Sequence, residues 1–128
     1  VIEAMQDFFR ESCAIAEETG VAKESLIFDP GIGFGKTPET NIEVLHRLQE
    51  LCVLDGEAYP LLLGASRKSF IGYALDLPVE ERLEATGAAT VLGVAAGASI
   101  VRVHDVKEIA RMCRMADIIL EDGKHGQD

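Results

Sequence analysis

Three short apolar runs recur along the chain, and each one ends in glycine or polar residues. The runs cover residues 25–28, 61–63 and 99–103, so their first residues are 36 and then 38 positions apart. Their side chains are apolar on both faces, which is typical of strands buried in a parallel sheet. This spacing matches a strand followed by a helix, a unit of roughly 30 or more residues. The pattern therefore predicts consecutive βα units.

The segments around these runs carry apolar side chains at helical spacing. Residues 2–19 form the first expected helix, which Gly20 ends, and residues 40–54 form the second. A third helix is expected from Pro78 to about residue 96, ended by Gly97, and a fourth over residues 106–120. Residues 121–128 are polar and are expected to form a flexible tail. The positions expected to face the core are Ile2, Met5, Phe8, Phe9 and Ala16 in the first helix and Ile42, Leu45, Leu48, Leu51 and Cys52 in the second.

The order of elements predicts an α/β fold with parallel strands and about four main helices. No low-complexity linker interrupts the chain, so residues 1–128 are expected to form a single partial domain. A complete (β/α)8 barrel needs about 250 residues, so these units amount to less than half of one. The alternative fold is a small three-stranded α/β layer whose open sheet edges are covered when the chain associates with another chain.

Composition and charge exclude several classes of function. The chain has 128 residues and a formal net charge of −10, and such an acidic field repels nucleic acids and acidic membrane surfaces. Cys13, Cys52 and Cys113 are far apart and odd in number, which favours reduced thiols in the cytoplasm over a disulfide or a zinc site. We expect no signal peptide. The uncharged stretch 85–101 is rich in Ala and Gly and is shorter than the roughly 20 apolar residues that span a bilayer.

Polar side chains follow each expected strand. They are Asp29 and Lys36 after the first strand, Ser66, Arg67, Lys68 and Ser69 after the second, and Arg102, His104 and Asp105 after the third. Because the carboxyl ends of parallel strands meet at one edge, these groups are expected to converge there, as ligands do in such folds. Clustered cations beside helix starts suit a phosphate or a diphosphate.

Each of these features also has a purely structural interpretation. Glycines at positions 31, 33 and 35 permit a tight irregular turn, and Asp29 before a proline is a common turn former. Arg67 and Lys68 suit a solvated helix start, and His104 with Asp105 suits a helix cap. The recurrence of polar groups at the same end of consecutive strands favours the binding interpretation.

Three motifs together resemble one enzyme family. "DPGIGFGKT", "GASRKSFIG" and "RVHDVKE" occur in the order and at the spacing of the dihydropteroate synthases of folate biosynthesis. The resemblance covers nearly the whole chain and implies the C-terminal part of a TIM-type (β/α)8 barrel. It further implies a Mg²⁺-assisted transferase that joins 6-hydroxymethyl-7,8-dihydropterin diphosphate to p-aminobenzoate and releases diphosphate. A cytoplasmic homodimer formed through the C-terminal helices is also implied.

The resemblance carries roles over to particular residues. It assigns the pterin to Asp29, Lys68 and Arg102, the p-aminobenzoate pocket to Phe34 and Ser69, and the diphosphate to Arg102 and His104. The implied catalytic residues are Lys68, Arg102 and His104, and no residue is implied as a metal ligand. A carboxylate such as Asp29 can accept two parallel N–H donors from the pterin, and a guanidinium can stack on its ring.

The chain lacks the first strands of that family, so by itself it is expected to be incomplete and inactive. Two alternatives remain open, namely a pterin-binding module without transferase activity and an interaction fragment that pairs through its helices. The helix over residues 85–96 has small side chains that allow close approach, and it is the expected partner surface.

Overall fold

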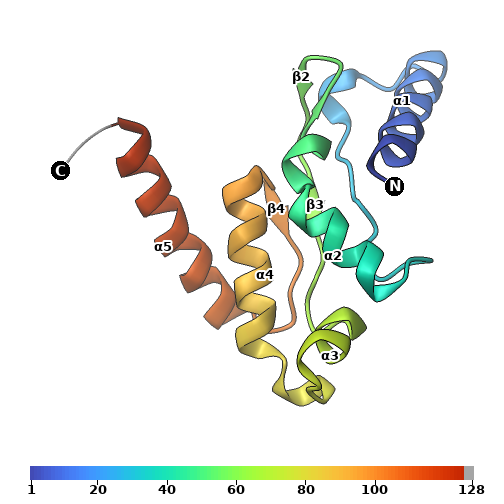
Figure 1. Ribbon diagram of the computed structural model, residues 1–128. Helices are drawn as coiled ribbons and strands as arrows, with labels where there is room; N and C mark the ends of the chain where they lie inside the picture. Colours follow the sequence, from blue (N-terminus) through green and yellow to red (C-terminus); the bar gives the residue numbers. More distant parts are fainter. Residues whose placement is uncertain (126–128) are drawn as a thin grey trace.

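The computed structural model describes residues 1–125. Helices form most of this part of the chain, and Figure 1 shows α1 and α5 at its opposite ends, with α4 and the strands between them. The α-helices are α1 (Ile2–Glu18), α2 (Pro38–His46), α3 (Ser69–Leu75), α4 (Leu83–Ala96) and α5 (Val106–His125). Short 3-10 turns cover Lys23–Ser25, Leu48–Leu51 and Val79–Glu81.

The three expected runs pair as parallel strands in their order along the chain. β3 (Leu62–Leu63) lies beside β4 (Ile100–Val101), with Leu62 opposite Ile100 and Leu63 opposite Val101. On the other side, Phe28 forms a parallel bridge with Leu61. The parallel arrangement is therefore confirmed, although the regular strands are shorter than the apolar runs.

An antiparallel hairpin was not expected from the sequence. β1 (Val53–Leu54) pairs with β2 (Glu57–Ala58) across a turn in which Asp55 and Gly56 have φ values of 52° and 82°. An Asp-Gly pair with two left-handed residues is typical of the tightest hairpins. The single helix predicted over residues 40–54 is wrong for this reason, since the last two of its residues belong to β1.

The other helix boundaries differ modestly from expectation. α2 starts earlier than predicted, at Pro38, because the Thr37 hydroxyl accepts a hydrogen bond from the Thr40 N–H at 3.2 Å and caps the helix. α3 was not predicted, and α4 starts at Leu83 rather than at Pro78. α5 continues to His125, five positions beyond the expected end at residue 120. Residues 126–128 of the expected tail lie outside the described residues.

The core lies between α1, the segment from α2 to the hairpin, and the strands. In α1, Ile2, Phe9 and Ala16 are buried, and the Phe9 ring stacks on that of Phe28 with centroids 4.3 Å apart. Phe8 was expected in the core but is 64% exposed. Adjacent residues point about 100° apart on a helix, so only one of the two phenylalanines can face the strands. Ile42 of α2 is likewise exposed, and Val44 is the fully buried apolar residue there.

α4 packs closely against elements on two of its sides. An added methyl group at Gly93 would lie 2.3 Å from Cδ2 of Leu63 in β3, and one at Gly87 would lie 2.4 Å from Sδ of Met112 in α5. Thr86 and Thr90 are also buried along this helix. The small side chains noted in the sequence therefore serve contacts within the chain, whereas Leu92, on another face of α4, is 71% exposed.

This packing predicts that Gly93→Ala destabilises the fold. The gain in helix propensity of about 1 kcal/mol is outweighed by overpacking against Leu63, which costs about 1–3 kcal/mol in a filled core. Gly87→Ala is expected to cost less, because the Met112 side chain is flexible and only partly buried. Urea unfolding compares the two variants with Ala95→Ser on the exposed side of α4. A Gly93→Ala protein as stable as the parent would contradict the close packing.

Candidate functional site at the strand ends

A hollow of about 200 Å³ opens where β3 and β4 end. It is lined by Gly64, Ser66, Lys68, Arg102, Val103 and His104. The structure thus brings together Lys68, Arg102 and His104, the three residues predicted to be catalytic. It does so because β3 and β4 are parallel neighbours, and the segments that follow them emerge at the same edge.

The Lys68 side chain connects the end of β3 to the glycine loop that follows Phe28. Its ammonium donates a hydrogen bond to the Ile32 carbonyl and lies 4.9 Å from the centroid of the Phe34 ring. Partial burial lowers the pKa of Lys68, and the nearby charge of Arg102 lowers it further, whereas Asp29 acts in the opposite direction. Lys68 is therefore a partly buried cation that lies near a second cation, Arg102.

The Arg102 side chain depends on the absence of a side chain at Gly64. A methyl group added there would lie only 3.0 Å from Nη2 of Arg102. The backbone N–H of Arg102 donates to the Leu63 carbonyl at 3.0 Å, so the residue continues the pairing of β4 with β3. Its guanidinium thus lies across the end of the neighbouring strand.

The His104 ring is held by a buried serine. The Ser66 hydroxyl lies 2.7 Å from Nδ1 of His104 and accepts a hydrogen bond from the His104 backbone N–H at 3.1 Å. Ser66 is only 5% exposed. The ring position is therefore fixed through Nδ1, which leaves Nε2 without a bond to Ser66.

The glycine loop has the tight conformation that the structural interpretation predicted. Gly31, Gly33 and Gly35 have φ values of 67°, 88° and 64°, a region that favours glycine. The buried side chain of Asn41 in α2 accepts a hydrogen bond from the Gly33 N–H at 3.0 Å, and Lys36 donates to the Gly31 carbonyl at 2.9 Å. Lys36 therefore stabilises its own loop and is not among the residues around the hollow.

Other predicted site residues also lie outside the hollow. Asp29 accepts a hydrogen bond from the Gly31 N–H at 2.8 Å, as a turn former does, and lines a separate hollow of about 320 Å³ beside the start of α1. Its charge still acts on Lys68. Phe34 is 68% exposed on the glycine loop, and Ser69 is the exposed first residue of α3.

Two further contacts near the hollow were missed by the sequence analysis. The Arg67 guanidinium donates to both carboxylate oxygens of Asp105, at 3.2 and 2.7 Å, and Ser66 holds His104 as described above. In both pairs the partners are 38 residues apart, the offset that also relates paired residues of β3 and β4. The matching offsets were visible in the sequence, but short strands leave the register open by a residue or two.

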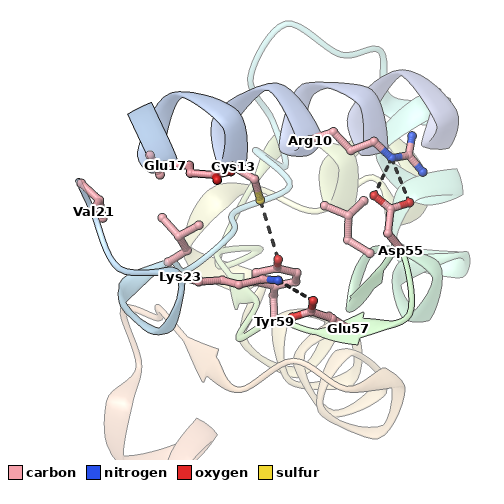
Figure 2. Close-up of a pocket in the computed structure, with 11 residues that line it drawn as sticks. Arg10, Cys13, Glu17, Val21, Lys23, Asp55, Glu57 and Tyr59 are labelled. Atoms are coloured by element: carbon pink, nitrogen blue, oxygen red, sulfur yellow. Dashed lines mark hydrogen bonds and ion pairs between the residues drawn. The ribbon is translucent and has the colours of Figure 1, made fainter. Parts of the chain in front are cut away.

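A larger hollow of about 480 Å³ lies at the other end of the strands, between α1 and the β1–β2 hairpin (Figure 2). Its charged groups are largely paired, Arg10 with Asp55 at 3.1 Å and Lys23 with Glu57. The Tyr59 hydroxyl is 3.9 Å from Sγ of Cys13, and burial raises the pKa of that phenol. This hollow contains none of the predicted site residues.

The described residues contain no ready-made cluster of metal ligands. Nowhere in that part of the chain do three His, Cys, Asp or Glu side chains gather closely enough to hold one. The hollow itself is lined by two cationic side chains and an imidazole, which suit an anion better than a metal cation. Among the same residues, no helix has the length and hydrophobicity to cross a membrane.

Comparison with known families identifies the relatives of this chain. A profile of the family described as "Pterin binding enzyme" matches residues 1–104. The chain belongs to this family.

Curated members of the pterin binding enzyme family resemble the chain over most of its length. The dihydropteroate synthase of Bacillus subtilis is 53% identical over 113 residues, which cover 88% of this chain and 39% of that protein. The dihydropteroate synthase of Escherichia coli is 42% identical over 120 residues, which cover 94% of this chain and 42% of that protein. The chain therefore spans about two fifths of the length of these relatives.

Solved structures of pterin binding enzymes have the same fold. The dihydropteroate synthase from Clostridium difficile, determined in the presence of pteroic acid, is 52% identical with a TM-score of 0.87 and matches 93% of this chain and 44% of that one. The enzyme from Burkholderia cenocepacia is 34% identical with a TM-score of 0.90, matching 97% and 48% of the two chains. One from Yersinia pestis, in a sulfonamide drug complex, is 35% identical with a TM-score of 0.87, matching 93% and 42%. The expected fold, part of a (β/α)8 barrel, is thus confirmed.

The electrostatics of the hollow predict opposite shifts in two variants. Arg102→Gln is expected to raise the pKa of Lys68 because it removes a neighbouring cation, and Asp29→Asn is expected to lower it because it removes a neighbouring anion. An NMR titration that follows the ¹³Cε resonance of Lys68 measures both shifts, with Asp55→Asn at the hairpin as a distant control. If Arg102→Gln leaves the titration unchanged, the two cations do not share the hollow.

Proposed function

We propose that this chain forms the part of a dihydropteroate synthase that binds the pterin diphosphate and neutralises the departing diphosphate. The observation that carries the proposal is the clustering of Lys68, Arg102 and His104 around one hollow on a chain whose net charge is −10. The relationship to dihydropteroate synthases supports it, as does the pteroic acid present with one of them. Pteroic acid is a pterin joined through a methylene group to p-aminobenzoate.

The reaction proposed for the complete enzyme is a displacement at that methylene carbon. The amino nitrogen of p-aminobenzoate forms a bond to the carbon while the bond from carbon to the diphosphate oxygen breaks. Diphosphate leaves with the electron pair, and the new secondary amine loses one proton to water. Cations and hydrogen-bond donors fixed around the leaving oxygen stabilise the charge that develops there. This is the role proposed for the cations Arg102 and Lys68 and for the His104 ring as a donor.

The remaining side chains are proposed to bind the two organic substrates. Asp29 has one carboxylate oxygen engaged by Gly31, and a carboxylate retains further lone pairs for the amino and ring N–H groups of a pterin. Phe34 and Ser69, both exposed, are proposed to line the p-aminobenzoate pocket. Holding both substrates in line for attack supplies much of the rate enhancement in such a bimolecular reaction.

The resemblance also implies Mg²⁺, a homodimer and a cytoplasmic location. We assign no step to Mg²⁺, because the described residues offer no cluster of protein ligands for it. A dimer through the C-terminal helices is supported by the exposed apolar residues Leu92 of α4 and Ile118 and Ile119 of α5, which are 71%, 53% and 60% exposed. The reduced thiols expected from the sequence support the cytoplasm.

A first test concerns the pterin site. In the full-length protein, Asp29→Asn is expected to weaken pterin binding by about 1.5–3 kcal/mol, the value of a hydrogen bond to a charged group. The thermal unfolding temperature should change little, because the carboxylate is exposed. Calorimetry with a pterin measures the affinity, and Asp55→Asn at the hairpin serves as the matched control. Unchanged affinity in Asp29→Asn would remove Asp29 from the site.

A second test concerns the chain by itself. We expect it to release no diphosphate from the pterin substrate and to self-associate, because Phe8 and Ile15 of α1 and Ile119 of α5 are each more than half exposed and apolar surface left in water costs about 25 cal/mol per Å². A diphosphate-release assay and light scattering measure these properties, with the Bacillus subtilis enzyme as the active control. A monodisperse monomer with full activity would contradict the need for the rest of the barrel.

A further inference from the structure

The offset that pairs β3 with β4 continues beyond the strands in contacts that involve side chains. Within the strands, Leu62 pairs with Ile100 and Leu63 with Val101. Beyond them the contacts are between Gly64 and Arg102, between Ser66 and His104, and between Arg67 and Asp105. Every one of these pairs is 38 residues apart, so the register of the sheet extends through the hollow.

Arg67 adopts a backbone conformation that is unusual for a residue with a side chain. Its φ value is 55°, in the left-handed region that costs free energy for residues other than glycine. Contacts from the region of α4 hold it there. The Arg67 N–H donates to the hydroxyl of the fully buried Thr86 at 3.0 Å, and the Arg82 guanidinium donates to the Arg67 carbonyl at 3.0 Å. Both backbone groups of this strained residue are thus satisfied.

The Arg67 side chain makes a two-pronged ion pair with Asp105. Nε and Nη2 lie 3.2 and 2.7 Å from the two carboxylate oxygens, and the hydrogen bond from Arg67 lowers the pKa of the Asp105 carboxyl. Arg67 directly precedes Lys68, and Asp105 directly follows His104. The pair therefore joins the backbone segments that carry two of the groups around the hollow, and a planar fork fixes their orientation better than a single contact.

Ser66 contacts His104 at both the backbone N–H and the ring nitrogen Nδ1. Its oxygen already accepts the backbone N–H of His104, and its own O–H can donate to Nδ1. In that arrangement the neutral ring carries its proton on Nε2, where it can donate to an anion in the hollow. Without the hydroxyl, the ring loses the contact that selects this tautomer.

We propose that Ser66, Arg67 and Asp105 are positioning residues that hold Lys68 and the Nε2–H of His104 toward a single anionic group. Arg67 and Asp105 are not among the residues that line the hollow, and the Ser66 hydroxyl is already engaged by His104, so all three act through Lys68 and His104. This inference rests on the proposed function, in which that group is the departing diphosphate. The inference adds that two features set the affinity for diphosphate. They are the fork between Arg67 and Asp105 and the tautomer of His104.

The test uses diphosphate as the probe and the full-length protein. Arg67→Lys keeps the charge but removes the fork, and Asp105→Asn keeps the shape but removes the charge. Each is expected to weaken diphosphate binding about tenfold, and the double variant is expected to be no weaker than the single ones, since both disrupt one contact. Arg47→Lys is the matched control. Arg47 forms the same kind of fork with Glu50, at 2.7 and 2.9 Å, and its side chain is 38% exposed compared with 35% for Arg67.

A spectroscopic measurement separates positioning from a general loss of stability. The ¹⁵N resonances of the imidazole report its tautomer, and His104→Gln identifies the signals. With diphosphate bound, the parent is expected to show the Nε2–H form, whereas Ser66→Ala is expected to show a mixture of tautomers and bind diphosphate about tenfold more weakly. Thermal unfolding is recorded for every variant, and Ser66→Ala provides the test if the Arg67 variant does not fold.

The outcomes distinguish this inference from the function on which it rests. If His104→Ala weakens diphosphate binding but Arg67→Lys and Asp105→Asn weaken it no more than Arg47→Lys does, the positioning role is wrong and the anion site remains. An unchanged tautomer in Ser66→Ala overturns the role of Ser66 in the same way. If His104→Ala itself binds diphosphate like the parent, the proposed anion site is wrong, and the positioning role is overturned with it.

Discussion

The parallel register between β3 and β4 is the constraint on which the site depends. Parallel strands place their carboxyl ends at one edge, and the offset of 38 residues decides which side chains meet there. A shift of one position would place Arg102 opposite Ala65 instead of Gly64, where a methyl group replaces the open space that the guanidinium now occupies. It would also turn the inward-facing side chains of a strand to the opposite face.

Packing around α4 maintains this register from the outside of the sheet. Gly93 brings the helix close to Leu63 in β3, and Gly87 brings α5 close to α4. Near its start the same helix, through Thr86, binds the backbone of Arg67. The helix therefore contacts the sheet, α5 and the segment that leads into the hollow. α4 thus combines apolar packing against β3 and α5 with a polar contact to the segment beside the hollow.

The sequence predicted the overall fold better than its details. The three apolar runs were sufficient to predict parallel strands, because apolar side chains on both faces are characteristic of a buried sheet. The hairpin was missed because residues 40–54 continue the helical spacing of apolar side chains, although Asp55 and Gly56 are a strong turn signal. Phe8 was misplaced because a stripe of apolar positions does not reveal which of two adjacent aromatic residues faces inward.

The convergence of Lys68, Arg102 and His104 was predicted from strand order alone. The support given by Ser66, Asn41 and Thr86 was not, since it depends on distances of a few ångströms between distant segments.

In Figure 1 the β1–β2 hairpin lies at one end of β3 and α3 lies at the other. The hollow opens at the end that leads into α3, where β3 and β4 end. Asp55 and Gly56 at its tip are exposed, and the turn connects strands of two residues each. Loop tips of this kind accept attachments with little effect on the elements they join. A fluorophore or a surface tether placed at this tip would leave the edge that carries Lys68 and Arg102 open to solution. The hairpin tip is therefore a suitable attachment site for binding measurements on an immobilised protein. It lies far from the cationic side chains that those measurements would probe.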